Sequence, residues 1–377
     1  MSTYSKNTLI GNWLFGQALQ VILLYGSKYY SGLASLVDPK PFSADVQIST
    51  KCNSRCITCD YWKSEARKRY PKHDLSTDQI EDIFTQLNEI GIKIVGFGGA
   101  EPLIRKDIGE LIRKAKEIVG GKVYLTTNGL LLERKAETLF ENGIDYISVS
   151  LDGIGGTDER IRGVPGHYDR AIRGIKKMKR LIETNESKSC ECNIGTTILR
   201  FNITEIPQLI ELASQLGTHW NFNLPDTNLA SYKNIDFTSL LANNARVIDH
   251  TIDYLHKLTE EKQEAFTLDP ASLEYARRYL KDKTPYRHCF LGYFRVYIDC
   301  KLNVYPGCWL LQPVGNLGEN RLKTIVKSDL YRMRVKEMYD VKCPGCTCGY
   351  LHNCMIEELP MTIKYFWKRM KTYRKYA

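Results

Sequence analysis

The chain has 377 residues, which is enough for one large domain and a smaller one. Its 43% of hydrophobic residues is ordinary for a globular protein and excludes a disordered chain. The net charge of +10 favours an acidic substrate, a membrane surface or nucleic acid as a partner. The 12 cysteines occur in short, clustered spacings that suit metal ligation better than a disulfide framework. Because thiolate-bound metal centres need reducing conditions, we expect a cytoplasmic protein.

The first segment, residues 1–43, contains no charged residue between Asn7 and Ser27. That length could span a bilayer, but asparagine, glutamine and glycine residues interrupt it. Its polar and apolar residues fall on different faces of a helix, and Trp13 and Phe15 suit an interface. Three interpretations stay open: a helix packed on the protein's own domain, a peripheral helix on the inner face of a membrane, and a true span. A signal peptide is rejected because a secreted chain would meet oxidising conditions.

Strand and helix patterns alternate, with short connections, between residues 44 and 226. The first strand covers Ala44 to Ile48, and the first helix begins after Ser76, a suitable N-cap, and ends at Gly91. The later elements are strand Ile94–Phe97, helix Ile108–Val119, strand Val123–Thr126, helix Glu133–Asn142, strand Tyr146–Ser150, helix Tyr168–Thr184, strand Asn193–Leu199, helix Glu205–Leu216 and strand Trp220–Asn223. This alternation predicts an α/β fold, a parallel sheet with crossover helices that closes into a partial barrel.

Three cysteines with the spacing C-x3-C-x2-C directly follow the first strand: Cys52, Cys56 and Cys59. Thiolates in one short loop can converge on a single metal centre, and three of them leave one coordination position unfilled. Structural zinc sites are closed by four ligands, usually two C-x2-C pairs, whereas thiolates also hold iron–sulfur clusters. The spacing therefore favours a cluster with one iron open to a substrate or cofactor. A zinc site completed elsewhere and unligated buried cysteines are the alternatives.

Glycines and polar side chains follow the next strands, where βα barrels place their active-site residues. Paired glycines let the backbone approach a ligand closely, and polar side chains that end a buried strand are costly unless they are used. An arginine beyond the fourth strand, in a predicted loop, could bind a carboxylate with both arms of its planar fork. The candidates are Gly98, Gly99, Glu101, Pro102, Thr127, Asn128, Ser150, Asp152 and Arg162. Taken singly, the residues of each stretch could equally form an ordinary turn or a helix cap.

The pattern changes after residue 226. Residues 227–284 are predicted to form a helical connection in which Leu240–Leu258 is the clearest helix, and residues 285–358 a small cysteine-rich domain with a hairpin that returns through Val304–Cys308. Residues 359–377 interleave basic and aromatic residues, which suits anionic lipid headgroups, single-stranded nucleic acid or a merely solvated tail. Together with the N-terminal helix, this tail favours a membrane surface, and nucleic acid is not an expected partner.

The cysteine loop resembles the cluster loop of the radical S-adenosylmethionine (radical SAM) enzymes. In that family, three cysteines bind a 4Fe-4S cluster whose open iron is chelated by the amino and carboxyl groups of S-adenosylmethionine. The family usually has an aromatic residue just before the third cysteine, where this chain has Thr58, followed by Tyr61 and Trp62. Gly98–Pro102 resembles the family's Gly-Gly-Glu-Pro motif, which contacts the methionine amino group, with Ala100 inserted. The other candidates look like its contacts to the ribose and the methionine carboxylate.

The resemblance runs from about residue 44 to residue 355 and implies an incomplete (β/α)6 barrel. It implies that a reduced cluster donates one electron to S-adenosylmethionine, giving methionine and a 5'-deoxyadenosyl radical. That radical takes a hydrogen atom from an unactivated carbon of the substrate. A flavodoxin- or ferredoxin-type reductant is then the expected partner.

The C-terminal cysteines resemble the SPASM/twitch extension of radical SAM enzymes, which holds auxiliary iron–sulfur clusters. In its twitch form, two spaced cysteines and a C-x2-C pair bind one 4Fe-4S cluster. The matching residues are Cys289, Cys308, Cys343 and Cys346. Cys348 and Cys354 remain, so a second auxiliary cluster would need another ligand, such as His352, or an open site. A structural zinc on Cys348, Cys354 and the C-x2-C pair is the alternative.

Auxiliary clusters can accept an electron from a substrate radical, which favours a two-electron oxidation of a small-molecule or lipid-linked substrate. A radical epimerase of a sugar or lipid-linked small molecule is the first alternative, because Cys300 could donate a hydrogen atom as in other radical epimerases. Cys300 could also be a small buried residue. The remaining alternatives are a peptide-modifying maturase and, in a different class, a non-catalytic iron–sulfur or zinc interaction protein.

Overall fold

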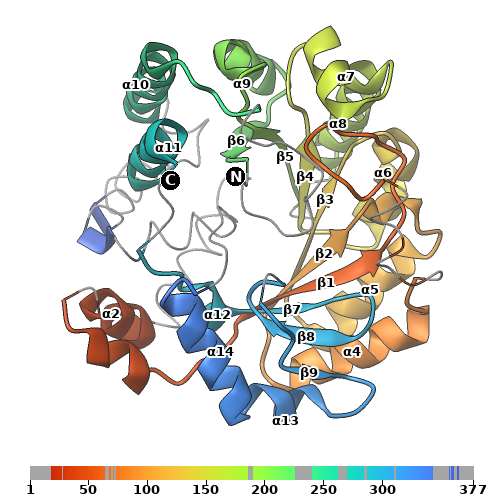
Figure 1. Ribbon diagram of the computed structural model, residues 1–377. Coiled ribbons are helices and arrows are strands. Elements are labelled where there is room, and N and C mark those ends of the chain that lie inside the picture. Colours follow the sequence, from red (N-terminus) through yellow and green to blue (C-terminus); the bar gives the residue numbers. More distant parts are fainter. Residues whose placement is uncertain are drawn as a thin grey trace.

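The computed structural model describes residues 18–27, 29–63, 68, 71, 74–185, 190–225, 240–261, 270–283, 287–309, 311–342, 356, 358–360 and 363–364. A curved sheet runs through this part of the molecule, and helices cover its outer side (Figure 1). The strands are β1 Ser43–Ser49, β2 Ile94–Gly99, β3 Lys122–Thr127, β4 Tyr146–Ser150, β5 Glu191–Thr197, β6 His219–Asn223, β7 Arg295–Ile298, β8 Asn303–Pro306 and β9 Gly315–Asn316.

The strand order is β6-β5-β4-β3-β2-β1-β7-β8-β9. All neighbours from β6 to β7 are parallel, whereas β7, β8 and β9 pair antiparallel. The predicted α/β partial barrel is therefore confirmed, and so is the hairpin that returns through Val304. The sheet does not stop at β1, because Val46 pairs with Ile298 of β7 on its other side. A seventh parallel strand thus joins the C-terminal segment to the barrel.

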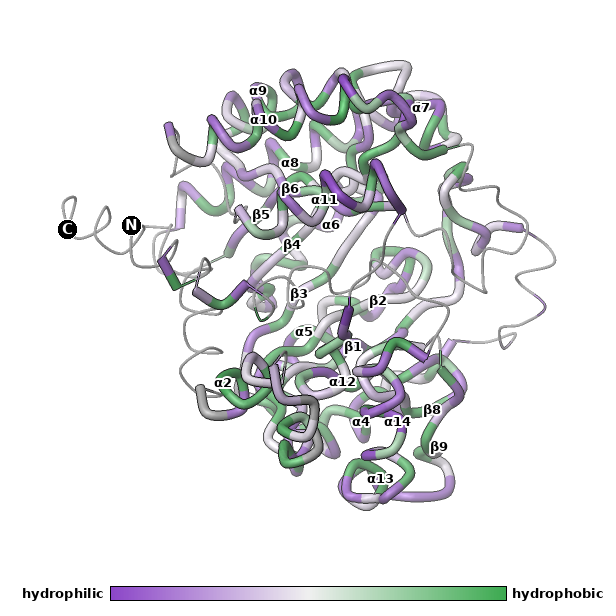
Figure 2. Tube along the Cα trace, turned by 60° about the vertical axis from the view of Figure 1, so that its left-hand side comes forward, coloured by the Kyte–Doolittle hydropathy of each residue, from purple (hydrophilic) through white to green (hydrophobic). Residues whose placement is uncertain are grey.

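Helices alternate with the strands as predicted. They are α4 Thr77–Glu89, α5 Ile108–Val119, α6 Leu132–Glu141, α7 Gly156–Arg162, α8 His167–Glu183, α9 Ile206–Gln215, α10 Ala245–Glu261, α11 Pro270–Asp282, α12 Leu291–Phe294, α13 Leu322–Val326 and α14 Asp329–Tyr339. Short 3-10 turns occur at η1 Ser31–Leu36, η2 Pro102–Ile104 and η3 Ile203–Glu205. Hydrophobic and hydrophilic residues alternate around α9 and α10, as amphipathic helices require (Figure 2).

Local sequence sets the ends of α4. The Ser76 hydroxyl accepts from the Gln79 backbone N–H at 3.2 Å, and the Gln79 side chain accepts from the Ser76 N–H at 2.9 Å. This reciprocal capping box satisfies two N–H groups that the helix itself cannot pair. The predicted N-cap is therefore confirmed. The buried face of α4 includes Ile80, Ile83 and Phe84, and the Phe84 ring stacks on Phe97 of β2 with centroids 5.8 Å apart.

Two predicted boundaries were wrong. Arg162 does not lie in a loop, because it ends α7, a helix of 7 residues that Gly163 terminates at φ +66°. So short a helix shows too little periodicity to be detected in the sequence. The helix expected from Leu240 instead begins at Ala245, since Asn244 accepts from the N–H groups of Arg246 and Val247 at 3.1 and 3.3 Å and thereby caps it.

The described part of the N-terminal segment packs on the protein's own domain. Helix α2, Ala18–Gly26, fully buries Leu24, and the Gln20 side chain donates to the Tyr293 carbonyl at 3.4 Å. The Ser27 and Tyr339 hydroxyls are 2.8 Å apart, which joins the end of α2 to α14. Trp13 and Phe15 lie outside the described residues, as do most of residues 361–377. Among the described helices, none has the length and apolar character to cross a membrane.

Candidate active site

The cysteine loop follows β1 and is held at several points. The Asp74 carboxylate accepts from the backbone N–H and the hydroxyl of Thr50, at 2.8 and 2.7 Å. Further along the loop, the N–H of Arg55 donates to the Arg162 carbonyl at 3.1 Å. The N–H of Ile57 donates to the Ile161 carbonyl at 2.9 Å. The loop is therefore fixed by its pairing with the last turn of α7.

Cys52, Cys56 and Cys59 are free thiols that lie close enough to influence one another electrostatically. Burial raises the pKa of Cys52 to about 11 and that of Cys59 to about 12, and the neighbouring cysteines add to both increases. Burial also raises the pKa of Cys56. The metal-free thiols are thus protonated at neutral pH, and a bound cation must displace their protons.

Three thiols from one short loop are the donor type that holds iron–sulfur clusters. In the part of the chain that the structure describes, no three His, Cys, Asp or Glu side chains converge closely enough to hold one metal ion. A single zinc ion needs every ligand atom within about 2.3 Å of the metal. In a cluster each thiolate binds a different iron, so the sulfurs need not meet at one point. The zinc alternative at this loop gains no fourth ligand among these residues.

Glu101 connects the ends of β2 and β3. It is 1% exposed, and its carboxylate accepts from the Thr127 hydroxyl at 2.7 Å and from the N–H groups of Asn128 and Leu103 at 2.8 and 3.0 Å. Burial raises the pKa of Glu101, while these hydrogen bonds favour its charged form. Both carboxylate oxygens are engaged inside the protein, so Glu101 positions the neighbouring strand ends.

Asn128 carries that connection to the cysteine loop. Its side-chain Nδ2 donates to the Asn53 side-chain Oδ1 at 2.7 Å and lies 3.9 Å from the Cys52 sulfur. Its own side-chain oxygen accepts from the Leu130 N–H at 3.0 Å. Asn53 was missed in the sequence, since a loop asparagine between two cysteines gives no distinguishing signal.

The glycine stretch is shaped by its close approach to the loop. Gly99 has φ +106°, and a Cβ there would lie 2.2 Å from the Ser49 carbonyl oxygen, so this position requires glycine. The N–H of the inserted Ala100 donates to that same carbonyl at 2.9 Å. Pro102 is buried at the start of η2, whereas a Cβ on Gly98 would meet only the Val46 carbonyl oxygen, at 4.0 Å. Gly98 thus leaves room beside its backbone.

The Arg162 side chain lies between Asp152, which follows β4, and Cys56 of the cysteine loop. One of its terminal nitrogens lies 2.8 Å from the Asp152 carboxylate, and the other lies 3.8 Å from the Cys56 sulfur. Asp152 also accepts from the Thr197 N–H at 2.7 Å. Burial raises the pKa of Asp152, and the guanidinium opposes that rise. The Arg162 Nε is buried without a hydrogen-bond partner among the described residues, as expected if a ligand carboxylate binds there.

A buried pair behind Asp152 was not anticipated. The Asp158 carboxylate accepts from the Asp152 N–H at 2.8 Å and lies 2.5 Å from the His167 Nδ1. Both side chains of this pair are 0% exposed. Ser150 ends β4 in register with Gly195 of β5. The ends of β1 to β4 therefore bring all the predicted barrel candidates to one edge of the sheet.

Cys300 lies at the same edge, two residues after β7. Its N–H donates to the Gln47 side-chain oxygen of β1 at 3.3 Å, and burial raises its thiol pKa to about 12. Cys289 and Cys308 are buried in one small cluster with Leu291 and Met338. The other predicted auxiliary-site residues lie outside the described residues: Cys343, Cys346, Cys348, His352 and Cys354.

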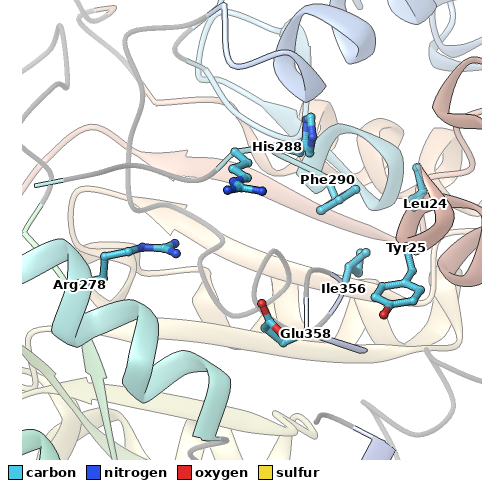
Figure 3. Close-up of a pocket in the computed structure, with 8 residues that line it drawn as sticks. Leu24, Tyr25, Arg278, His288, Phe290, Ile356 and Glu358 are labelled. Carbon is cyan, nitrogen blue, oxygen red and sulfur yellow. The ribbon is translucent and has the colours of Figure 1, made fainter. Parts of the chain in front are cut away.

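A cavity of about 200 Å³ lies at the other end of the sheet (Figure 3). His288 and Phe290 line it directly before α12, and Arg278 of α11 extends toward it from the opposite side. The start of β7 is in parallel register with the start of β1, so this cavity lies away from the loop that follows β1. It is not part of the candidate active site.

The model of the radical SAM superfamily matches residues 46–213, which include the cysteine loop and every candidate at the ends of β2 to β4. Residues 46–213 therefore form a radical SAM domain. A 4Fe-4S cluster and S-adenosylmethionine are the groups that this family implies. The three free thiols and the unpartnered Arg162 Nε fit them.

Relatives by sequence include the Fe-coproporphyrin III synthase of Methanosarcina barkeri, 31% identical over 169 residues, which are 45% of this chain and 40% of that protein. The AdoMet-dependent heme synthase of Oleidesulfovibrio alaskensis is 28% identical over 325 residues, 80% of each chain. The chain spans only 40% and 46% of the length of the first two curated relatives it matches.

Solved radical SAM structures share the fold. Native anSMEcpe with bound AdoMet has a TM-score of 0.62 at 16% identity and covers 87% of this chain and 100% of its own. Streptococcus suis SuiB bound to the precursor peptide SuiA has a TM-score of 0.61 at 17% identity and covers 80% of this chain and 68% of its own. At such identities the likeness concerns the fold alone.

Proposed function

We propose that the protein is a radical SAM enzyme that carries out a two-electron oxidation of a small-molecule or lipid-linked substrate. The observation that carries the proposal is the loop of three free thiols after β1, which Asn128 after β3 and Arg162 at the end of α7 contact. In this proposal, Cys52, Cys56 and Cys59 hold the 4Fe-4S cluster. The remaining barrel candidates form the S-adenosylmethionine site, in which Glu101 positions the strand ends: Gly98, Gly99, Glu101, Pro102, Thr127, Asn128, Ser150, Asp152 and Arg162.

When bound, the cluster and S-adenosylmethionine would supply a 5'-deoxyadenosyl radical, a species able to take a hydrogen atom from an unactivated substrate carbon. The protein's own residues orient the site. Asn128 and Arg162 each lie against one cysteine sulfur, and such outer contacts fix ligand orientation and tune a metal centre. The Arg162 charge stabilises the thiolate form of Cys56, since an adjacent cation lowers the pKa of a thiol.

The second electron of the oxidation would pass to an auxiliary 4Fe-4S cluster. Cys289 and Cys308 come from segments before and after the β7–β8 hairpin. Their side chains nevertheless lie in one buried group of apolar residues, which suits two ligands of one centre. We assign Cys343 and Cys346 as the other two ligands. Cys348 and Cys354 are left for a second centre.

Epimerisation is the second candidate, and the position of Cys300 favours it. Cys300 follows β7 at the edge that carries the cysteine loop, hydrogen-bonded to β1. A thiol there can return a hydrogen atom, with its electron, to a substrate radical. Cys300 would be left as a thiyl radical that a reductant must quench. Retained turnover in a Cys300→Ala variant would favour the oxidation.

The relatives supply test substrates. Because two relatives are named as synthases of Fe-coproporphyrin III and of heme, and the likeness to the second extends over 80% of each chain, porphyrins are the first small molecules to test. SuiB was solved with a precursor peptide, so a peptide is the second.

We further propose a cytoplasmic enzyme that associates with the inner membrane face through exposed side chains around α2, namely Ile22, Tyr29, Tyr30 and Leu36, which are 58–73% exposed. Flotation with anionic vesicles tests that association.

The decisive experiment measures 5'-deoxyadenosine formation from S-adenosylmethionine by anaerobically reconstituted protein with dithionite. The wild type should form it, and a Cys56→Ala variant should form none. Cys190→Ala is the matched control, since Cys190 is buried just before β5, away from the loop. Formation by Cys56→Ala would refute the assignment of the three-cysteine loop as the reacting centre. No formation from wild type with a full iron content would refute the enzyme and support the non-catalytic interaction protein.

A further inference from the structure

Trp62 has no role in the proposed chemistry, but its position is unusual. Its indole N–H donates to the Cys56 carbonyl at 3.0 Å, although the residue is 38% exposed. The ring therefore touches the cysteine loop on one side and solvent on the other. Tryptophan in such a position is typical of the centre of a protein interface, where it buries a large apolar area.

Exposed cations surround the same part of the loop. The guanidinium carbons of Arg160 and Arg200 lie 4.3 and 4.6 Å from the centroid of the Phe201 ring. Phe201 and Ile57, the residue after Cys56, pack against one small apolar cluster of the neighbouring strand and helix ends. Arg55, the residue before Cys56, is also exposed. Arg55 therefore precedes Cys56 in the loop, and Arg160 and Arg200 flank Phe201, which packs on the same apolar cluster as Ile57.

None of these three arginines forms an ion pair with a described residue. Arginines elsewhere in the same part of the chain do, including Arg105, Arg277 and Arg321. The sequence just after Trp62 adds to the positive charge, since Lys63 to Lys72 contains five cations and one carboxylate. Uncompensated charge of one sign attracts a partner of the opposite sign and speeds its encounter.

We propose that this surface, formed by Trp62, Arg55, Arg160 and Arg200 and here called the Trp62 face, docks an acidic one-electron donor protein. The inference rests on the proposed function, because an iron–sulfur centre behind the loop must be reduced from outside. In the step, the donor loses one electron, the enzyme gains it, and no bond forms or breaks. The Trp62–Cys56 hydrogen bond links the docking surface directly to a cluster cysteine.

Binding of oxidised flavodoxin, an acidic flavoprotein, tests the surface without turnover. The variant Arg160→Glu/Arg200→Glu should raise the Kd by about tenfold or more, because two attractive charges become repulsive. The control Arg134→Glu/Lys176→Glu reverses two exposed cations on α6 and α8 that form no ion pair with described residues, and it should leave the Kd within about twofold. Added salt should weaken wild-type binding. Equal weakening in both variants, or in neither, would overturn the proposal.

A comparison of two reductants separates docking from catalysis. With reduced flavodoxin, the Arg160→Glu/Arg200→Glu enzyme should form 5'-deoxyadenosine at least about tenfold more slowly, and with dithionite at the wild-type rate. An equal loss with both reductants would mean that the face serves an anionic substrate or the fold, which overturns docking. If wild-type protein makes no product with dithionite, the proposed function fails, and the flavodoxin affinities still decide the Trp62 face.

Discussion

Arg162 shows how one side chain can serve both the fold and the site. It lies between the buried Asp152 carboxylate and the Cys56 sulfur. Removing one partner of a buried ion pair leaves the other charge without compensation in a medium of low dielectric. The cost therefore falls on stability as well as on chemistry, and the two effects need separate measurements.

The variant Arg162→Gln should lower the free energy of unfolding of the metal-free protein by about 3 kcal/mol, measured in urea. Adding Asp152→Asn should recover most of that loss, since it removes the unpaired charge. Formation of 5'-deoxyadenosine should stay absent in the double variant, because the contact with Cys56 is still missing. A single variant as stable as the wild type would show that Asp152 is already protonated.

Asp107 gives the pH dependence that the structure predicts best. Burial alone would raise its pKa, but hydrogen bonds from Arg105 at 2.6 and 2.9 Å and from Thr77 at 2.7 Å outweigh burial, and the pKa lies below the usual 3.8. A depressed pKa stabilises the fold above the unfolded-state pKa, and this stabilisation is lost as the pH falls through the folded-state value.

We therefore expect Asp107→Asn to lower the free energy of unfolding by about 1–2 kcal/mol at pH 7. The difference from wild type should shrink as the pH falls below about 4, the unfolded-state value, because Asp107 then progressively loses its charge. Urea unfolding at pH 7, 5 and 3 measures it. A difference that stays constant with pH would assign the effect to packing alone.

At the scale of elements, α7 fixes the cysteine loop through its last residue and its cap. Gly163 has φ +66°, and a Cβ there would lie 2.3 Å from the Arg55 carbonyl oxygen. Gly120 caps α5 at nearly the same dihedral, φ +65°, with nothing within 4 Å of its Cβ position. Replacing either glycine by alanine should therefore cause the same backbone strain. Only the replacement at Gly163 would also clash with the cysteine loop.

Gly163→Ala should abolish 5'-deoxyadenosine formation and reduce the iron bound on reconstitution, since the loop must shift to admit the methyl group. Gly120→Ala should cost about 1 kcal/mol of stability and leave activity unchanged. Iron content and product formation are measured on both variants. Activity in Gly163→Ala at the level of Gly120→Ala would mean that the loop adapts.

The sequence was most informative where local chemistry decides the element. The helix Ile108–Val119 and the strand Tyr146–Ser150 were predicted to the residue, because a hydrophobic stripe or a period of two marks each. Helix α7 was missed because its 7 residues are too few to show a helical period. The partners that orient the site, such as Asn53 and the buried Asp158–His167 pair, depend on contacts between distant strand ends, which no local pattern encodes.

For the whole molecule, the continuous sheet is the main surprise. Composition suggested a separate C-terminal unit, yet β7 pairs with β1 in parallel register, and Val296 and Ile298 are fully buried against the barrel. The first strand of the barrel, β1, therefore depends on residues that follow the helical connection. An exposed, apolar strand edge is an aggregation site.

A chain that ends at residue 284 should consequently aggregate. Without β7, the β1 edge loses its partner along Ser43 to Val46, and the core loses the buried Phe294 beside it. Co-expression of residues 285–377 should restore a soluble complex, because the missing strand can pair in trans. Size-exclusion chromatography of both preparations measures this. A monomeric, cooperatively unfolding 1–284 fragment would instead show that the six strands β1 to β6 suffice and that β7 only borders the site.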